Sequence, residues 1–418
     1  MTVRGPGPVI PAIAAGRRSH RAGRTIHIAN LSQPSRVWPQ PDALRPKEHF
    51  RTRFRLADGT TVIKIGERKV LFSESRQKLF ELNDAAACLA SRLGGGATYA
   101  NLLEDLVCKG LDRAVAAPGI RDMLQAWSKE GLAVADLSFP IGGQDFGQSI
   151  AISGTKVWLR YRTPELSTRI APAFQHLENG PSASATTYDV VNCGGFTLVS
   201  RNRQPAAIMA ARNAAPALKA LLTEEVLEAS EAFTALHAAC LLDRQRAMLL
   251  CGSPGAGKST LTIALDAAGF AYGGDDITLM DHSGLVRGVP FPLTAKSGSW
   301  PLVQGFRPDL GRTRIHRRLD GKRVRYLPPT EPARPDWTPV RWVIRLRRKG
   351  GSSATLKPRE PADALADLLG EAYSKSGGTT VENLRMLIGV VSTARCHELI
   401  YSDLNDAVRA LERLCADA

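Results

Sequence analysis

Residues 252–260, GSPGAGKST, decide the fold of this chain. The stretch fits the pattern G-x-x-x-x-G-K-[ST] at every fixed position. The apolar residues 247–251 before it predict a strand, and the amphipathic run LTIALDAAGF after it predicts a helix. A strand, a glycine-rich loop and a helix in this order are typical of a phosphate-binding loop, or P-loop, in an α/β domain.

Each fixed residue type of the motif has a chemical reason. Glycines let the backbone turn tightly enough for consecutive N–H groups to face phosphate oxygens, and the helix N-terminus adds its positive dipole end. The Lys258 cation suits the β- and γ-phosphates, and the Ser259 hydroxyl suits a Mg²⁺ ion beside them. We therefore expect ATP and Mg²⁺ as cofactors. The residues expected to hold the nucleotide are Gly252, Ser253, Pro254, Gly255, Ala256, Gly257, Lys258, Ser259 and Thr260.

Two adjacent carboxylates favour phosphoryl transfer over nucleotide binding alone. Asp275 and Asp276 follow Lys258 closely, with room for one helix and one short strand between them. At the mouth of a phosphate site, one carboxylate can help to hold Mg²⁺ while the other accepts a hydroxyl proton. The alternative is that Gly274 and the two aspartates form only a polar turn, since Gly and Asp favour turns. The P-loop just upstream favours the functional interpretation.

Residues 148–418 resemble the HPr kinase/phosphorylase family, including its relatives that phosphorylate serine in ribosomal peptides. The resemblance rests on the segment LHAACLLDRQRAMLLCGSPGAGKSTLTIALDAAGFAYGGDDITLM. It implies a P-loop kinase fold of the HPr kinase/PEP carboxykinase type. It also implies Asp275 as general base, Asp276 as a support for the metal and its network, and His237 beside the active site together with Lys258. Taken alone, His237 would more often be an ordinary packed histidine.

The chain also departs from the family pattern. Bacterial HPr kinases carry a signature segment after the Asp pair, with a metal-binding Glu and nearby glycines, and we find no such segment here. The departure puts phosphorylase activity, and HPr as the substrate, in doubt. It favours a specialised relative that acts on another hydroxyl.

A basic stretch follows the Asp pair. Its members are Arg312, Arg314, Arg317, Arg318, Lys322, Arg323 and Arg325. Near a nucleotide site such a stretch can hold phosphates or an acidic substrate, although it is usually a solvated face. The segments VRGVPFPLTAKSG and GKRVRYLPP resemble family segments that bring basic groups to the substrate, so Lys296 and Arg323 are candidate substrate-binding residues. A solvated cation is the alternative for each.

Residues 51–138 have the pattern of a small α+β domain. The run FRLADGTTVIKIGERKVLF predicts short strands, with turns at residues 58–59 and 66–67. Apolar spacing then predicts helices over about 74–93, 99–109 and 117–131. The phrases LFELNDAAACLASRLGGGATYANLLEDL and LQAWSKEGLAVA resemble the PqqD-like domain, the RiPP recognition element of peptide-modifying systems. The resemblance implies a winged-helix-like fold that captures the leader of a precursor peptide as an added strand at a sheet edge. An unrelated winged-helix module is the alternative.

The remaining segments complete the predicted domain organisation. Residues 1–50 lack periodicity and predict a basic flexible tail, and residues 139–147 predict a linker before the kinase-like domain, 148–418. Within that domain we expect strands over 149–161, 186–202 and 205–211, then a helix over about 215–242. The last strand and helix are expected at 396–401 and from 402–403 to 414.

Charge and composition exclude several classes of protein. The net charge is +15, but residues 1–55 hold eleven Arg and Lys against two acidic residues, so +9 of the excess lies in this N-terminal stretch. Without interleaved aromatic residues, nucleic-acid binding is not expected. Seven scattered cysteines, with no C-x-x-C pair, argue against a disulfide framework or a zinc site. No apolar run is long enough to span a membrane, so we expect a soluble cytoplasmic protein.

Together these patterns predict an ATP-dependent phosphotransferase. The expected reaction moves the γ-phosphoryl group to a Ser- or Thr-type hydroxyl of a precursor peptide held through its leader. A kinase for a small hydroxyl metabolite is one alternative, and a nucleotide-gated binding protein without transfer is another. Known HPr kinases assemble as rings, so a homo-oligomer also remains open.

Overall fold

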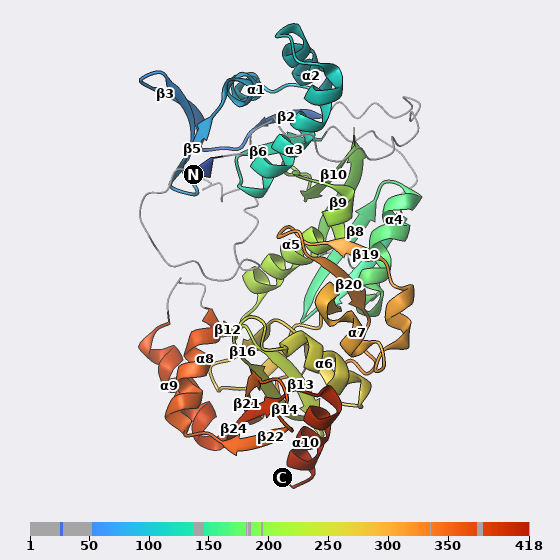
Figure 1. Ribbon diagram of the computed structural model, residues 1–418, viewed down its shortest axis with the longest axis vertical. Helices are drawn as coiled ribbons and strands as arrows, with labels where there is room; N and C mark the ends of the chain where they lie inside the picture. Colours follow the sequence, from blue (N-terminus) through green and yellow to red (C-terminus); the bar gives the residue numbers. More distant parts are fainter. Residues whose placement is uncertain are drawn as a thin grey trace. The chain divides into compact units, whose positions relative to one another are not determined.

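Strands and helices are mixed along the chain, and the computed structural model confirms a mixed α/β fold at the level of fold class (Figure 1). The structure describes residues 26–27, 52–137, 146–180, 182, 185–193, 195–334, 336–373 and 379–417. Most of the predicted tail and of the predicted linker therefore lie outside the described residues. In the described ranges no helix is long and apolar enough to cross a membrane.

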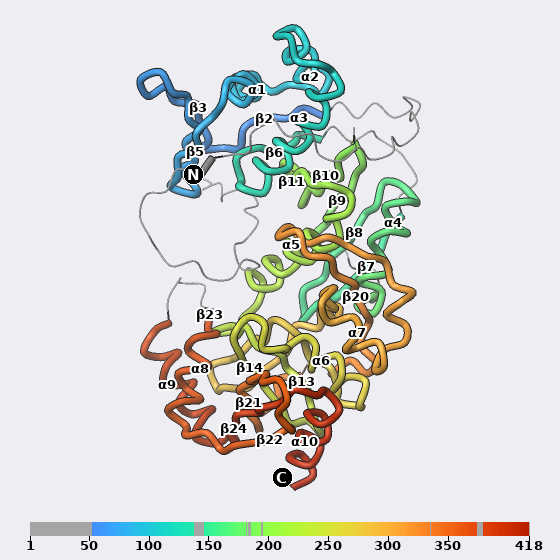
Figure 2. Tube along the Cα trace, in the orientation of Figure 1, coloured from blue at the N-terminus to red at the C-terminus, as the bar shows by residue number. Residues whose placement is uncertain are grey.

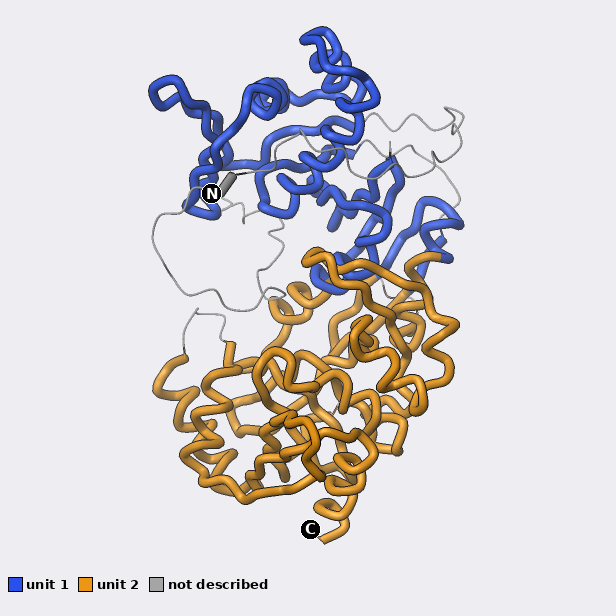
Figure 3. The backbone as a smooth tube through the Cα atoms, viewed as in Figure 1, with its two compact units in different colours: residues 1–148, 158–168, 186–221 blue, residues 149–157, 169–185, 222–418 orange. Residues whose placement is uncertain are grey.

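The backbone separates into two compact units, coloured in Figure 3. Unit 1 comprises residues 1–148, 158–168 and 186–221, and unit 2 comprises residues 149–157, 169–185 and 222–418. The chain passes from one unit to the other within four elements. They are β7 (Phe146–Ile152), β8 (Thr155–Tyr161), α4 (Pro164–Ile170) and α5 (Ala214–Ala229).

Unit 1 begins with short strands followed by helices, as the sequence predicts. Its strands are β1 (Ile26–His27), β2 (Arg53–Leu56), β3 (Thr60–Ile65), β4 (Arg68–Ser73), β5 (Lys78–Leu82) and β6 (Ala133–Asp136). Its helices are α1 (Asp84–Gly94), α2 (Tyr99–Cys108) and α3 (Arg113–Lys129). The strand orders are β1-β5-β4-β3 and β2-β6. Both predicted turns are confirmed, because Gly59 and Gly66 have the positive φ values, 72° and 59°, that glycine adopts without strain.

Later strands complete the core of unit 1. They are β9 (Thr186–Cys193), β10 (Phe196–Arg201) and β11 (Ala207–Met209), which pair antiparallel in that order. Phe196 and Ile208 of these strands pack with Trp127 of α3 and Phe54 of β2 in one buried cluster. The strands predicted over 149–161, 186–202 and 205–211 are thus confirmed as β7 to β11.

Two helix predictions near the N-terminal strands are wrong at their starts. Helix α1 begins at Asp84 rather than near residue 74, because residues 78–82 pair with β4 and Asn83 caps the helix by accepting a 2.9 Å hydrogen bond from the Ala86 N–H. Helix α3 begins at Arg113, four residues before the prediction. There the Asp112 carboxylate accepts the Ala114 N–H at 2.6 Å.

Unit 2 is built on a six-stranded sheet with the order β15-β13-β14-β21-β24-β22. The strands are β13 (Ala239–Asp243), β14 (Arg246–Cys251), β15 (Ala271–Gly274), β21 (Val340–Arg348), β22 (Thr355–Pro358) and β24 (Arg395–Tyr401). The central strands β14, β21 and β24 run parallel and side by side, as the trace in Figure 2 shows. The other three strands pair antiparallel with their neighbours.

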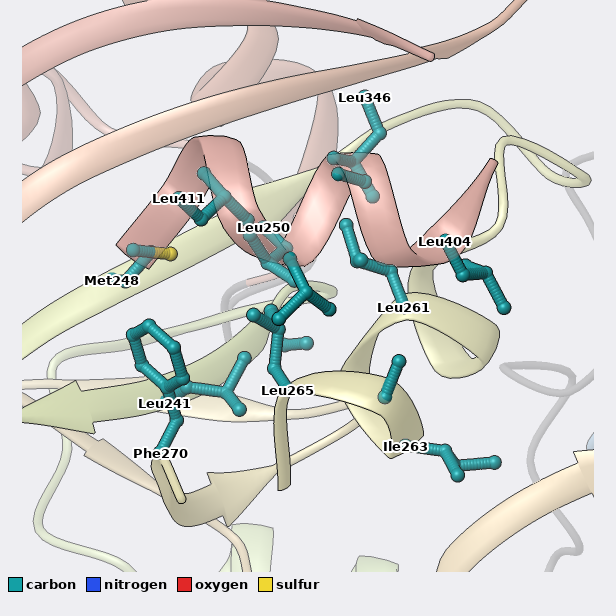
Figure 4. Close-up of a cluster of buried hydrophobic side chains, with 14 of the residues drawn as sticks. Leu241, Met248, Leu250, Leu261, Ile263, Leu265, Phe270, Leu346, Leu404 and Leu411 are labelled. Atoms are coloured by element: carbon teal, nitrogen blue, oxygen red, sulfur yellow. The ribbon is translucent and has the colours of Figure 1, made fainter. Parts of the chain in front are cut away.

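Side chains of β14 point alternately to the two faces of this sheet, and both faces are buried. Met248 and Leu250 pack with residues of α6 (Lys258–Ala267) and α10 (Leu404–Ala416), and Figure 4 shows Leu261 of α6 and Leu411 of α10 around Leu250. Leu249, on the opposite face, packs with residues of α8 (Pro361–Glu371) and α9 (Val381–Thr393). A period of two on a strand buried on both faces explains this arrangement.

Two smaller sheets flank the P-loop region of unit 2. One has the order β17-β16-β12-β23, and the other has the order β18-β20-β19. Their strands are β12 (Thr234–Leu236), β16 (Thr278–Met280), β17 (Val286–Gly288), β23 (Ala372–Tyr373), β18 (Leu293–Lys296), β19 (Ile315–Arg317) and β20 (Arg323–Leu327). The short helix α7 (Trp300–Val303) follows β18.

The helix predicted over 215–242 is wrong in its second half. Helix α5 ends at Ala229, and β12 and β13 occupy residues 234–236 and 239–243. Strand pairing with β16, β23 and β14, all later in the chain, overrides the local helical pattern. By contrast, the last strand and helix are confirmed as β24 and α10, with the Asp403 carboxylate capping α10 through the Asp406 N–H at 3.0 Å.

Candidate functional site

The P-loop motif lies between β14 and α6, and the predicted strand and helix on its two sides are confirmed. Gly255 and Gly257 have φ values of 94° and 97°, the left-handed region that favours glycine. A Cβ atom on Gly257 would overlap the Tyr401 hydroxyl. That hydroxyl donates a 3.0 Å hydrogen bond to the Ala256 carbonyl. Tyr401 of β24 therefore supports the loop through its hydroxyl, and only glycine fits at position 257 against that hydroxyl.

The Lys258 side chain turns back over the loop. Its Nζ donates to the Gly252 carbonyl at 2.9 Å and to the His237 carbonyl at 3.3 Å, and it lies 3.9 Å from Glu371 Oε1. The side chain is only 10% exposed. The cation is therefore held at the start of α6, where the helix dipole also favours an anion.

The rest of the motif forms the first turn of α6 and the exposed tip of the loop. Ser259 and Thr260 are half-buried in that first turn, whereas Ser253 and Pro254 are exposed. Arg345 of β21 brings a second cation to the tip, because its Nη2 donates to Ser253 Oγ at 3.3 Å while Nη1 pairs with Asp367 at 2.7 Å. The loop thus combines backbone N–H groups, a helix N-terminus and two cations, which suits a polyphosphate.

The two aspartates directly follow β15 and differ in environment. Asp275 is buried, with 2% of its surface exposed, and its Oδ2 accepts the Thr294 N–H at 3.2 Å. The Asp276 side chain is about half exposed. Gly274 permits the close approach of β15 to the next segment, since a Cβ there would lie 2.6 Å from the Val289 carbonyl oxygen. One carboxylate is therefore fixed within the protein and the other faces the solvent side of the site.

His237 joins Asp276 to the P-loop lysine. Its Nε2 lies 3.0 Å from Asp276 Oδ1, its Nδ1 lies 3.2 Å from Glu371 Oε2, and its backbone carbonyl accepts from Lys258. Hydrogen bonds to Asp276 and then to Glu371 raise the pKa of His237 to about 9 and outweigh the opposing effect of burial. The imidazole is therefore protonated at neutral pH and donates from both nitrogens.

Glu371 completes this group, and the sequence analysis missed it. Burial would raise the pKa of the Glu371 carboxyl, but the hydrogen bond from His237 and the positive charges of Lys258, His237 and Arg345 lower it below its usual value. The residue ends α8 and stands 134 positions after His237. The pairing of β12 with β23 and the His237 N–H bond to the Glu371 carbonyl at 2.9 Å bring the two together. No local motif around Glu371 signals this role.

The two candidate substrate cations lie on different faces of the β18-β20-β19 sheet. Lys296 stands opposite Val324 and shares the face of Tyr326, whereas Arg323 is on the alternate face with its guanidinium 5.6 Å above the Trp300 ring. Lys296 and Tyr326 interact electrostatically with Asp275 and Asp276. The structure thus brings Lys296, and not Arg323, into the surroundings of the aspartates.

The candidate metal ligands, Ser259 and Asp276, belong to no all-protein cage. Within the described ranges, no group of three or more His, Cys, Asp or Glu side chains could hold a metal ion. Mg²⁺ is commonly held by one or two protein oxygens together with substrate phosphates, and hydroxyl and carboxylate oxygens suit that arrangement. All seven cysteines are free, as expected from their spacing.

A scan against models of protein families and a search of curated proteins both find no match to this chain.

Proposed function

We propose that this chain is an ATP-dependent kinase, with a P-loop domain of the HPr kinase-related type, that phosphorylates a Ser- or Thr-type hydroxyl of a precursor peptide. One observation carries the proposal: the P-loop lysine and Asp276, one member of the aspartate pair, belong to one hydrogen-bonded group. Lys258 bonds the His237 carbonyl at 3.3 Å, and the His237 imidazole bonds Asp276 at 3.0 Å. A phosphate-binding cation that is joined in this way to one carboxylate of an adjacent pair suits group transfer better than binding alone.

The phosphate end of the site is formed by the loop and its cations. Backbone N–H groups of Gly255, Gly257, Lys258 and Ser259, together with the N-terminus of α6, bind the anionic chain of ATP. Lys258 and Arg345 place positive charge beside it, and both are already held in position by carbonyl or carboxylate partners. Groups fixed before the reaction stabilise charge on the transferring phosphoryl group at little cost in reorganisation.

The residues also fit a magnesium ion. When bound, Mg²⁺ supplies positive charge that stabilises the phosphate oxygens during transfer. The Ser259 hydroxyl and the Asp276 carboxylate would hold it, and His237 fixes the orientation of that carboxylate through its 3.0 Å bond. Glu371 in turn holds the other nitrogen of the imidazole.

The acceptor end depends on Asp275. Its Oδ2 is oriented by the Thr294 N–H, so the carboxylate has a fixed direction within the site. In the proposed step Asp275 takes the proton of the acceptor hydroxyl, and the hydroxyl oxygen forms a bond to the γ-phosphorus. The bond from that phosphorus to the ADP oxygen breaks, and ADP leaves with the electron pair. The proton on Asp275 is later released to solvent.

Residues 51–138 capture the leader of the peptide, as the PqqD-like resemblance implies. Strand β5 pairs with β4 on one side and, on the other, with residues 26–27 of the chain's own N-terminal region, in parallel. An edge that takes an extended segment of this chain has backbone groups suited to an added peptide strand. Leader capture would raise the local concentration of a weakly bound core hydroxyl near the kinase domain.

Mass spectrometry tests this function. The full chain is incubated with Mg-ATP and a candidate precursor-like peptide, both full-length and leaderless. Gain of one phosphoryl mass on the full-length peptide, with little or none on the leaderless one, is the expected result. ATP binding without any phosphorylated peptide would contradict a peptide kinase, and equal modification of both peptides would contradict leader capture.

A further inference from the structure

A group of basic side chains lies near Asp275 and Asp276. Lys296 ends β18 and is exposed, while Arg318 and Lys322 belong to the turn that connects β19 with β20. A hydrogen bond of 2.9 Å from the Arg318 N–H to the Lys322 carbonyl closes this turn. We call Lys296, Arg318 and Lys322 the basic cluster.

Strand register fixes the direction of the cluster. Lys296 stands opposite Val324 in the β18–β20 pair, so it shares a sheet face with Tyr326 and not with Arg323. The same strand, β18, contains Thr294, whose N–H binds the Asp275 carboxylate at 3.2 Å. Lys296 is therefore two residues along the strand from the residue that orients the proposed base.

Electrostatic effects agree with this placement. The pKa of Lys296 lies below its usual value because surrounding protein removes solvent from the ammonium group and Arg318 adds a second positive charge. The negative charges of Asp276 and Asp275 raise the pKa of Lys296 and offset this lowering only in part, and the positive charge of Lys322 lowers the pKa further. Cations gathered this closely repel one another, and an anion bound between them would relieve the repulsion.

The contacts of the two aspartates indicate whether the basic cluster binds the nucleotide or the acceptor. Asp276 connects through His237 to Lys258 and the P-loop, where the nucleotide phosphates have their own cations. Asp275 connects instead to β18 and thus to the basic cluster. Since Thr294 and Lys296 belong to the same strand, the cluster lies beside the proposed base, where the acceptor hydroxyl must bind, and Lys296 also interacts electrostatically with Asp276. Asp320, which pairs with Arg318 at 3.4 Å and with Lys322 at 3.8 Å, is the one acidic residue of residues 312–325, so the segment keeps a large positive excess.

We propose that Lys296, Arg318 and Lys322 bind carboxylates of the acceptor, so that the substrate of this site is an acidic peptide segment with Asp or Glu next to the phosphorylated hydroxyl. The inference rests on the proposed kinase function and specifies its substrate. Carboxylates suit guanidinium and ammonium groups, and several pairs together orient the peptide as well as hold it.

Binding of defined peptides tests the inference without requiring catalysis. Fluorescein-labelled Glu-Asp-Ser-Asp-Glu and its neutral counterpart Gln-Asn-Ser-Asn-Gln are titrated with the full chain, and anisotropy is measured. We expect the acidic peptide to bind about tenfold more tightly, and its affinity to fall as salt rises from about 0.05 to about 0.5 M because the charges are screened. Equal affinity of the two peptides would overturn the inference.

Charge reversal locates the effect. Lys296→Glu should weaken the acidic peptide about tenfold and leave the neutral one unchanged. Arg385→Glu, at an exposed position of α9, changes the net charge equally and should have no effect. If Lys296→Glu fails to fold, Lys322→Ala in the exposed turn should still weaken the acidic peptide. Equal losses in Lys296→Glu and Arg385→Glu would show that only net charge matters, which contradicts a defined cluster.

Kinetics separate this inference from the proposed function. In phosphorylation assays with the full-length precursor-like peptide, Lys296→Glu should raise the KM for that peptide and leave the KM for ATP unchanged. A rise in the KM for ATP alone would assign the cluster to the nucleotide and overturn the inference. Tight, Lys296-dependent binding of the acidic peptide, together with no phosphorylation of the full-length precursor-like peptide, would refute the kinase function, while the acidic-peptide surface would stand.

Discussion

Gly257 and Tyr401 should be energetically coupled, since the two residues share one small space under the P-loop. Gly257 has a φ of 97°, and a Cβ atom there would overlap the Tyr401 hydroxyl. The next nearest atom of the ring, Cζ, would lie 3.6 Å from that Cβ, an ordinary contact distance. Tyr401→Phe therefore makes room for Gly257→Ala. It does not relieve the backbone strain.

The magnitudes follow from these contacts. Gly257→Ala should cost about 3 kcal/mol, roughly half from the left-handed backbone and half from the overlap. Tyr401→Phe should cost about 1 kcal/mol, since it removes the 3.0 Å hydrogen bond to the Ala256 carbonyl. Independent effects would add to about 4 kcal/mol in the double variant. Without the overlap we expect about 2.5 kcal/mol, which is a coupling of about 1.5 kcal/mol.

Amide hydrogen exchange of peptides that cover α6 measures the free energy of local opening at α6 in each variant, without assuming that both units unfold together. About 1.4 kcal/mol corresponds to a tenfold change in the opening equilibrium, so Gly257→Ala should speed exchange of α6 by about a hundredfold. The double variant should exchange more slowly than Gly257→Ala alone. If the two substitutions prove additive within about 0.5 kcal/mol, the packing of Tyr401 on Gly257 is wrong.

Two further predictions concern the histidine and the N-terminal edge. In Glu371→Gln, which keeps the size of the side chain, the pKa of His237 should fall from about 9 toward its usual value, because one of the two carboxylates that favour the imidazolium is lost. An NMR titration of the metal-free protein checks this, and an unchanged midpoint near 9 would refute the contact with Glu371. In the wild type the raised pKa adds stability that is complete below about pH 6.5 and disappears as the pH rises through about 9. Deletion of residues 1–50 should strengthen binding of the leader peptide, since residues 26–27 and the leader would compete for the same edge of β5. Calorimetry of the two proteins with the leader peptide tests it, and weaker binding after the deletion would show that the tail assists capture instead.

Much of the P-loop region could be predicted because its information is local. The glycines, Lys258 and the flanking strand and helix all lie within residues 246–267, and each residue type has one chemical reason. The Asp pair was predicted from its short spacing after Lys258, and the end of β15 places it there. The final strand and helix were predicted because Asp403 is an ordinary N-cap.

Long-range pairing explains what could not be predicted. Glu371 reaches His237 only because β12 pairs with β23, and nothing near Glu371 in the sequence indicates that pairing. The same sheet ends α5 at Ala229, where the apolar pattern alone continued a helix. Lys296 and Arg323 were grouped by charge, yet strand register separates them onto two faces, and register is set by pairing that the sequence does not reveal.

Asp275→Asn tests the central claim most directly. The substitution keeps the shape of the side chain and its acceptor oxygen for the Thr294 N–H, but it removes the base. Asp336→Asn, at an exposed position, is the matched control. With Mg-ATP and the full-length precursor-like peptide, we expect Asp275→Asn to bind ATP as the wild type does and to lose phosphoryl transfer by a factor of about 10²–10⁴, while Asp336→Asn keeps both. Full transfer activity in Asp275→Asn would contradict the assignment of Asp275 as the base that makes this site a kinase.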